Sequence, residues 1–242
     1  MALHFLTADA AGAEPGDVVT LGGAEARHAA VVRRVRAGER VTLGDGGGVW
    51  LGGVVETTGP GSVAVRVETR ELRPAPTSRV ILVQALAKGD RDERAVQAAC
   101  ELGVDEIVPW QAARSVSRWD GTKAAKGRER WATIVREAAK QAHRAWVPEV
   151  SAVETTADIA SRAASQRVLV LDPAATTRVS TLQDDGRDVV LVVGPEGGIA
   201  TEELERLSAA GAERMLLGET VLRTSTAGPA ALAALNVLRG RW

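Results

Sequence analysis

Apolar residues form short, broken runs in the first third of the chain. RVTL, VWLGGVVE and SVAVRVE are separated by GDGGG (44–48) and TGPG (58–61). Glycine and proline at these breaks are typical of hairpin turns, so this part is expected to be β-rich. One helix is expected before the hairpins, over GAEARHAAVVRRV (23–35). The pattern predicts a small β domain at the N-terminus.

Beyond residue 80 the pattern changes to continuous apolar runs with helical segments between them. The runs are VILVQAL (80–86), EIVPW (106–110), RVLVLDP (167–173), DVVLVVG (188–194) and RMLLG (214–218). Short, fully apolar runs are typical of strands buried on both faces of a parallel sheet. Between residues 127 and 146, apolar residues recur at helical spacing. The second part of the chain is therefore expected to be an α/β domain.

The two patterns meet at ELRPAPTSR (71–79), where two prolines within three residues favour an extended connector. We expect one domain over residues 1–73, a linker over 74–79 and a second domain over 80–242.

Composition narrows the class of protein. The chain has 242 residues, 45% of them hydrophobic and 25% charged, as is usual for a folded soluble protein. No stretch is long and apolar enough for a membrane helix, and the start MALHFLTADA lacks the features of a signal peptide. We expect a cytoplasmic protein that does not bind membranes. Cys100 is the single cysteine, so a disulfide framework or a cysteine metal site is not expected.

The net charge of −1 hides an uneven distribution, because basic residues gather in the middle of the chain. Residues 114–144 hold nine basic and three acidic residues, interleaved with tryptophans. Such a mixture can contact phosphates and stack on bases, or it can be a solvated helix face. The candidate RNA-binding residues are Arg33, Arg34, Lys88, Arg91, Arg114, Arg136, Lys140 and Arg144. Arg136, Lys140 and Arg144 are spaced to form one stripe along a helix.

Three turns follow predicted strands and are candidates for ligand contact. They are LDP (171–173), GPEGG (194–198) and LGETVLRTSTAG (217–228). Ligands of open α/β sheets bind at the carboxyl ends of the strands. GPEGG does not match the dinucleotide fingerprint or the phosphate-binding loop, so neither a dinucleotide nor ATP is favoured. Its glycines allow a ligand to approach the backbone closely, although they also suit a plain tight turn. Thr201 is expected to cap the helix that follows.

These motifs, in this order, resemble a known family. GPEGG followed by LGETVLRTSTA, together with KGDR (88–91), ELGVDEIVPW (101–110) and REAAKQAHR (136–144), is similar to the SPOUT methyltransferases. The members it resembles methylate N3 of a uridine in bacterial small-subunit (16S) ribosomal RNA. The resemblance covers residues 80–242, and the N-terminal part resembles that family's PUA-like RNA-binding domain. One position departs from the family pattern: Ser225 stands where a glutamate is usual.

The resemblance implies a trefoil-knotted methyltransferase domain that binds S-adenosylmethionine without a metal. The implied cofactor-binding residues are Leu171, Asp172, Pro173, Gly194, Pro195, Glu196, Gly197, Gly198, Leu217, Gly218, Val221, Leu222, Arg223, Thr224 and Thr226. The N3 proton must leave during transfer, and Arg223 is the first candidate for stabilising the resulting charge. Glu196 is a candidate base, but a role in capping a helix or orienting the cofactor is also open.

The implied partners are ribosomal RNA of the small subunit and a second copy of the chain. In this family the knotted domains pair through the last helix, which here is TAGPAALAALNVLRGRW (226–242). Two alternatives remain open. The first is a methyltransferase of the same fold that acts on another RNA, such as transfer RNA or large-subunit ribosomal RNA. The second is a non-catalytic RNA-binding module of the same fold.

Overall fold

The computed structural model describes residues 2–59 and 61–242. The chain forms two compact units, and each is described by itself. The N-terminal unit comprises the chain up to Ala75 together with Ala139–Val147. The C-terminal unit comprises Pro76–Ala138 and Pro148–Trp242. Ala139–Val147, which the sequence pattern placed in the second domain, therefore packs with the first.

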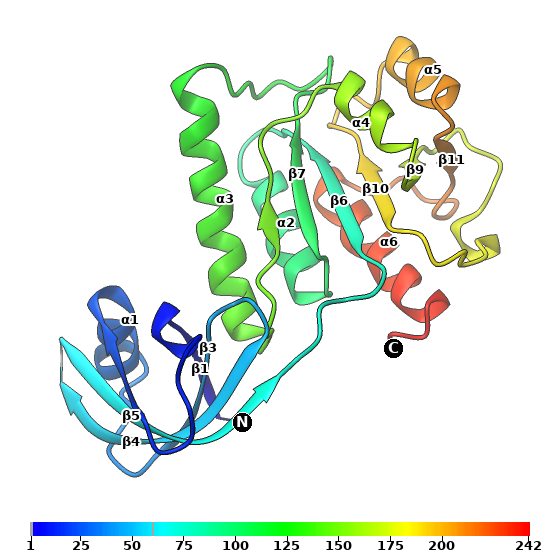
Figure 1. Ribbon diagram of the computed structural model, residues 1–242. Coiled ribbons are helices and arrows are strands. Elements are labelled where there is room, and N and C mark those ends of the chain that lie inside the picture. Colours follow the sequence, from blue (N-terminus) through cyan, green and yellow to red (C-terminus); the bar gives the residue numbers. More distant parts are fainter. Residues whose placement is uncertain (1, 60) are drawn as a thin grey trace. The chain divides into compact units, whose positions relative to one another are not determined.

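The N-terminal unit is built on a sheet of five described strands (Figure 1). In sheet order these are β1 (Leu3–Leu6), β3 (Arg40–Gly44), β4 (Val49–Gly59), β5 (Ser62–Leu72) and β2 (Val18–Gly22). β1 and β3 are parallel, and the other neighbours are antiparallel. The expected hairpin strands are confirmed as β3, β4 and β5. Pro60, in the predicted turn TGPG, lies outside the described residues.

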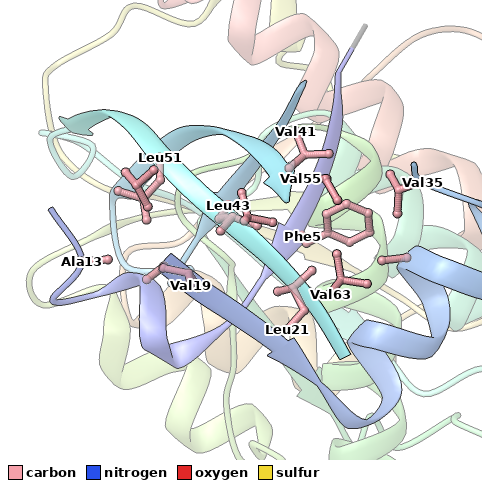
Figure 2. Close-up of a cluster of buried hydrophobic side chains, with 14 of the residues drawn as sticks. Phe5, Ala13, Val19, Leu21, Val35, Val41, Leu43, Leu51, Val55 and Val63 are labelled. Atoms are coloured by element: carbon pink, nitrogen blue, oxygen red, sulfur yellow. The ribbon is translucent and has the colours of Figure 1, made fainter. Parts of the chain in front are cut away.

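Alternate residues of these strands point into one apolar core, as a half-buried sheet requires. Figure 2 shows Phe5 of β1 packed with Val55 and Val63 of the hairpin and with Leu21 of β2, and all four are at most 1% exposed. A short helix covers this core: α1 (Gly23–Arg27) continues as a π-helical turn, η2 (His28–Val32). The predicted helix over 23–35 is thus present but ends early, because Arg34 takes a left-handed conformation (φ 56°). A 3-10 turn, η1 (Ala8–Ala10), links β1 and β2.

The segment Ala139–Val147 completes the N-terminal unit through backbone contacts. Gly48 donates to the carbonyl of Ala145 (3.0 Å), and Val147 donates to the carbonyl of Gly46 (2.9 Å). The Trp146 indole lies so close to Gly48 that a Cβ at this position would be 2.7 Å from the ring. Gly48 also has a φ of +104°, which favours glycine. The run GDGGG is therefore both a hairpin turn and the seat for Trp146.

Lys140 is part of this core, contrary to its predicted place in an exposed basic stripe. Its side chain is 2% exposed, and its Nζ lies 3.0 Å from Glu25 Oε2 and 3.4 Å from His28 Nδ1. The other oxygen of Glu25 accepts the backbone N–H of Leu6. A lysine buried in an ion pair is not available to RNA, so Lys140 is removed from the candidate RNA-binding residues.

We expect Lys140→Met to destabilise the N-terminal unit by about 3 kcal/mol, because Glu25 would keep its charge in a partly buried place without a partner. Urea unfolding of the full chain measures this loss. The double variant Lys140→Met, Glu25→Gln should recover most of it, since the glutamine oxygen still accepts from Leu6. Equal stability of the single variant and the wild type would contradict a stabilising role for the pair.

The C-terminal unit holds a parallel sheet of six described strands (Figure 1). In sheet order these are β11 (Glu213–Met215), β9 (Arg167–Leu171), β10 (Val189–Val193), β6 (Val80–Ala85), β7 (Glu106–Trp110) and β8 (Glu149–Val150). Every pair of neighbours is parallel. The central strands are buried along their whole length. The α/β fold class predicted from the continuous apolar runs is confirmed.

Helices cover both faces of this sheet. The described elements are α2 (Arg91–Glu101), α3 (Thr122–Gln141), α4 (Thr156–Arg162), η3 (Val179–Thr181), α5 (Thr201–Ala209) and α6 (Thr224–Leu238). α2 and α6 pack together, as do α4 and α5. Gly228 lets α6 approach the sheet closely, since a Cβ there would lie 3.0 Å from Leu82. Cys100 is buried in α2. In the part of the chain that is described, no helix has the length and apolar character needed to cross a membrane.

Candidate cofactor pocket

One cavity of about 510 Å³ opens at the carboxyl ends of β9, β10 and β11. These strands and β6 are neighbours in the sheet, so the turns after them meet at one edge. All three turns that the sequence singled out contribute to the wall. The predicted residues that line it are Leu171, Asp172, Pro173, Gly194, Pro195, Glu196, Gly198, Leu217, Gly218, Val221, Leu222, Arg223 and Thr224. Gly197 and Thr226 were also predicted but are not among the lining residues.

The lining includes residues that sequence reasoning missed. They are Val193, Ile199, Leu204, Met215, Leu216, Thr220 and Ala227, together with Arg91, which had been assigned to RNA contact. Most are apolar side chains at strand ends or on the first turns of helices. An apolar residue next to a glycine-rich turn gives no signal in the sequence that separates a pocket wall from an ordinary core position.

The turn Gly194–Gly198 is held in place by contacts with three other segments. Thr224, the first residue of α6, donates its hydroxyl to the carbonyl of Gly194 (2.8 Å) and accepts from the Gln84 side-chain amide (2.9 Å). Gln84 is fully buried at the end of β6. Within the turn, Gly198 donates to the carbonyl of Pro195 and has a φ of +71°. The turn that faces the cavity is therefore rigid.

Glu196 fastens the same turn to the loop after β6. Its Oε1 accepts the backbone N–H of Lys88 (3.1 Å) and the guanidinium of Arg91 (2.5 Å). Partial burial would raise the pKa of Glu196, but the hydrogen bonds from Arg91 and from backbone N–H groups outweigh it and hold the pKa below its ordinary value. A carboxylate with a lowered pKa is a weak base. The geometry favours a structural role for Glu196, in which it holds the turn in place, over the predicted role as general base.

Arg114 holds the turn from the side of β7. Its Nη1 donates to the carbonyl of Gly197 (3.1 Å), and a Cβ on Gly197 would lie 3.3 Å from the Arg114 Cβ.

Glu203, buried in the first turn of α5, accepts the backbone N–H groups of Ala113 (3.0 Å) and Ala200 (3.2 Å). Ala200, and not Thr201, is the N-cap, because Glu203 supplies the capping oxygen.

The segment Leu217–Leu222 offers unpaired backbone groups to the cavity. Its N–H and C=O groups make no hydrogen bond with any residue in the ranges 2–59 and 61–242. The charged side chains of Asp172 and Glu196 are tied to Arg214 and Arg91. Arg223 is exposed and forms no ion pair with the described residues. An apolar cavity with free backbone donors and acceptors and one free cation suits a nucleoside-sized ligand with polar edges.

The remaining candidate RNA-binding residues are not among those that line the cavity. Arg33 and Arg34 are exposed beyond the π-helical turn of the N-terminal unit, and Lys88 is exposed in the loop after β6. Arg136 is exposed on α3, and Arg144 is half-buried in the segment after it. No cluster of histidine, cysteine, aspartate or glutamate with the geometry of a metal site occurs among the residues described.

The chain matches two family models, an RNA methyltransferase domain over residues 73–236 and an RNA methyltransferase PUA domain over residues 21–68. It is therefore an RNA methyltransferase with a PUA domain. A ribosomal RNA small subunit methyltransferase E of Mycobacterium bovis is 46% identical over 95% of this chain and 90% of its own length. The chain belongs to the ribosomal RNA small subunit methyltransferase E family, and the resemblance read from its motifs is confirmed.

Two solved structures share the fold over nearly the whole chain. A ribosomal RNA small subunit methyltransferase E from Neisseria gonorrhoeae, bound to S-adenosyl methionine, has a TM-score of 0.89 at 27% identity and covers 98% of both chains. A putative methyltransferase from Legionella pneumophila, in complex with bound S-adenosylmethionine, has a TM-score of 0.86 at 30% identity and covers 98% of this chain and 96% of that chain.

We expect Glu196→Gln to weaken S-adenosylmethionine binding by about tenfold, because it removes the charge-assisted hydrogen bond from Arg91 that holds the turn. Calorimetry measures the affinity, with Glu202→Gln on the exposed start of α5 as the matched control. The pH dependence of methyl transfer should keep its shape, since Glu196 is not the base in this account. Loss of the acidic limb of that profile in Glu196→Gln would instead assign it the proton.

Proposed function

We propose that this protein transfers a methyl group from S-adenosylmethionine to N3 of a uridine in small-subunit (16S) ribosomal RNA. The observation that carries the proposal is the single cavity formed by the three turns of the family motif, in a chain 46% identical to a named member over 95% of its length. The unpaired backbone groups of 217–222 are available to hydrogen-bond an adenine, and the apolar wall suits its ring. S-adenosylmethionine supplies the reactive methyl group when it is bound.

The residues of this chain then bind, orient and stabilise charge. The turn Gly194–Gly198 orients the cofactor because contacts outside the cavity fix it, and the segment 217–222 contributes its unpaired backbone groups. Arg223 stabilises the negative charge that develops on the uracil oxygens as the N3 proton leaves. Its guanidinium is free for this role among the described residues. The target uridine is flipped out of its stack so that N3 enters the cavity.

We assign no protein side chain as the proton acceptor. Glu196 is engaged by Lys88 and Arg91, and its lowered pKa makes it a poor base. The proton passes to solvent at the cavity mouth in this proposal. Ser225, where the family usually has a glutamate, carries a hydroxyl but no charge and is not among the lining residues. We further infer that the segment after β11 is threaded as a trefoil knot, as in the family this chain resembles.

We also infer that the working unit is a homodimer in the cytoplasm that acts on the small ribosomal subunit or its RNA. Ala231 and Leu235 of α6 are fully buried within the protomer, so they are not part of the dimer face. The exposed apolar residues at this end of the chain are Val237 (62%), Leu238 (38%) and Trp242 (64%). They support pairing through the last turn of α6, and Val237→Asp should shift the sedimentation mass towards one chain.

The proposal is tested by incubating the purified protein with labelled S-adenosylmethionine and three RNA pools: 16S ribosomal RNA, 23S ribosomal RNA and transfer RNA. The expected result is label in 16S ribosomal RNA alone. Binding of the cofactor without transfer to any RNA would favour the non-catalytic alternative. Label in transfer RNA or 23S ribosomal RNA would assign the chain to another substrate.

A further inference from the structure

The loop between β7 and α3 (residues 111–121) is ordered by contacts that leave its tip exposed. Gln111 accepts the backbone N–H of Trp119 (3.1 Å) and donates to the carbonyl of Ser117 (3.2 Å). Ser115 donates its backbone N–H to the carbonyl of Ala112. The Gln111 side chain and the backbone bond from Ser115 to Ala112 therefore hold the loop in one conformation.

Trp119 fixes the loop against α3 and is not a free stacking platform. Its ring packs edge-to-face on Trp131, with centroids 5.0 Å apart. It also lies on Gly127, where an added Cβ would be 2.4 Å from the indole. The sequence pattern suggested that tryptophans in the basic segment stack on bases. Trp131 is 1% exposed and Trp119 half-buried, so these two residues instead hold the loop on the helix.

The tip carries an exposed apolar side chain between two arginines. Val116 is 72% exposed, and Arg114 and Arg118 on either side are also exposed. Lys123 and Lys126 follow on the exposed first turns of α3. Arg118, Lys123 and Lys126 form no ion pair with any residue in the described ranges. A rigid loop that presents unpaired cations around an apolar residue has already lost the conformational freedom that binding would otherwise remove.

The loop is tied to the glycine-rich turn of the cavity through Arg114, which donates to the carbonyl of Gly197. We propose that Val116, Arg118, Lys123 and Lys126 form an RNA-binding surface, here called the loop surface, for the strand that flanks the target nucleotide. The three cations contact backbone phosphates, and Val116 packs against a base or ribose of the same strand. This inference rests on the proposed function. In the basic segment, the RNA contact is therefore assigned to the loop and the start of α3 instead of to Lys140.

Charge complementarity selects RNA as the occupant. The two carboxylates that line the pocket are already engaged, Glu196 by Arg91 and Asp172 by Arg214. The three cations of the loop surface form no ion pairs with the described residues and outnumber the one carboxylate among them, Asp120, so the local charge stays positive. A polyanion next to the pocket would release counterions on binding, which gives the inference a measurable signature.

The test uses the full-length protein, 16S ribosomal RNA transcript and a salt series. The triple variant Arg118→Ala, Lys123→Ala, Lys126→Ala should bind the RNA roughly 30-fold more weakly near 0.15 M salt, with a log–log salt slope smaller in magnitude by about 2. Calorimetric affinity for S-adenosylmethionine should be unchanged. Arg206→Ala, on the exposed face of α5, is the matched control and should leave RNA binding as in the wild type.

Val116→Ser separates the apolar contact from the electrostatic one. It should weaken RNA binding about fivefold without changing the salt slope, because no phosphate contact is lost. RNA affinity and salt slope equal to the wild type in the triple variant would overturn the loop surface, while wild-type methylation would leave the proposed function standing. A wild-type protein that methylates none of the RNA pools would overturn the proposed function itself.

Discussion

A Gly218→Val variant should fold normally and bind S-adenosylmethionine roughly 100-fold more weakly than the wild type. Gly218 lines the cavity, and a Cβ built on it meets no protein atom within 4 Å. The branched side chain therefore enters the space of the ligand and does not clash with the fold. Calorimetry gives the affinity, and circular dichroism with thermal unfolding checks the fold.

Gly12→Val is the matched control for this experiment, because Gly12 also has open space around its Cβ and does not line the cofactor cavity. It should bind the cofactor as the wild type does. Gly197→Val is less informative, since its side chain would press on Arg114. A folded Gly218→Val protein with wild-type affinity would remove this cavity as the cofactor site.

Arg223→Ala should lower kcat for methyl transfer by about 100-fold while cofactor affinity changes little. The reason is that the guanidinium acts on charge present mainly in the transition state. Arg223→Lys should restore part of the rate, because the positive charge remains but the planar fork is lost. Single-turnover transfer to 16S ribosomal RNA measures the rate.

The control for Arg223 is Arg206→Ala, which removes an exposed arginine of α5 that does not line the cavity. It should transfer methyl groups at the wild-type rate. An Arg223→Ala enzyme with full kcat would leave the charge on the uracil ring without a protein partner, and the proposed role of Arg223 would be wrong.

The sequence predicted the C-terminal sheet well because its strands are continuous apolar runs that are buried on both faces. It predicted the three turns of the cavity because glycine and proline mark them directly. It did not predict β1 and β2, because both strands are short. In β2, exposed and buried residues also alternate. The pairing of β1 with β3 depends on residues nearly forty positions apart, and no local pattern reports it.

The larger errors concern side chains whose partners are distant in the chain. Lys140 shares its helical spacing with Arg136, yet Glu25, 115 residues away, draws it into the N-terminal core. Arg91 remains a predicted RNA contact, but its ion pair with Glu196, 105 residues away at the pocket wall, gave no signal in the sequence. Periodicity places a residue on a helix face and leaves open which neighbour covers that face. The packing of Ala139–Val147 with the N-terminal unit follows from the same limitation.

The most direct test of the central claim is to identify the methylated nucleotide in 16S ribosomal RNA. Small subunits from a strain that lacks this gene would be treated with the purified protein and S-adenosylmethionine, digested to nucleosides and fragments, and analysed by mass spectrometry. The expected result is one new N3-methyluridine at a single position, absent when the Gly218→Val protein is used. A methyl group on another base or another atom of uridine, or no methylation of the subunit and its RNA, would contradict it.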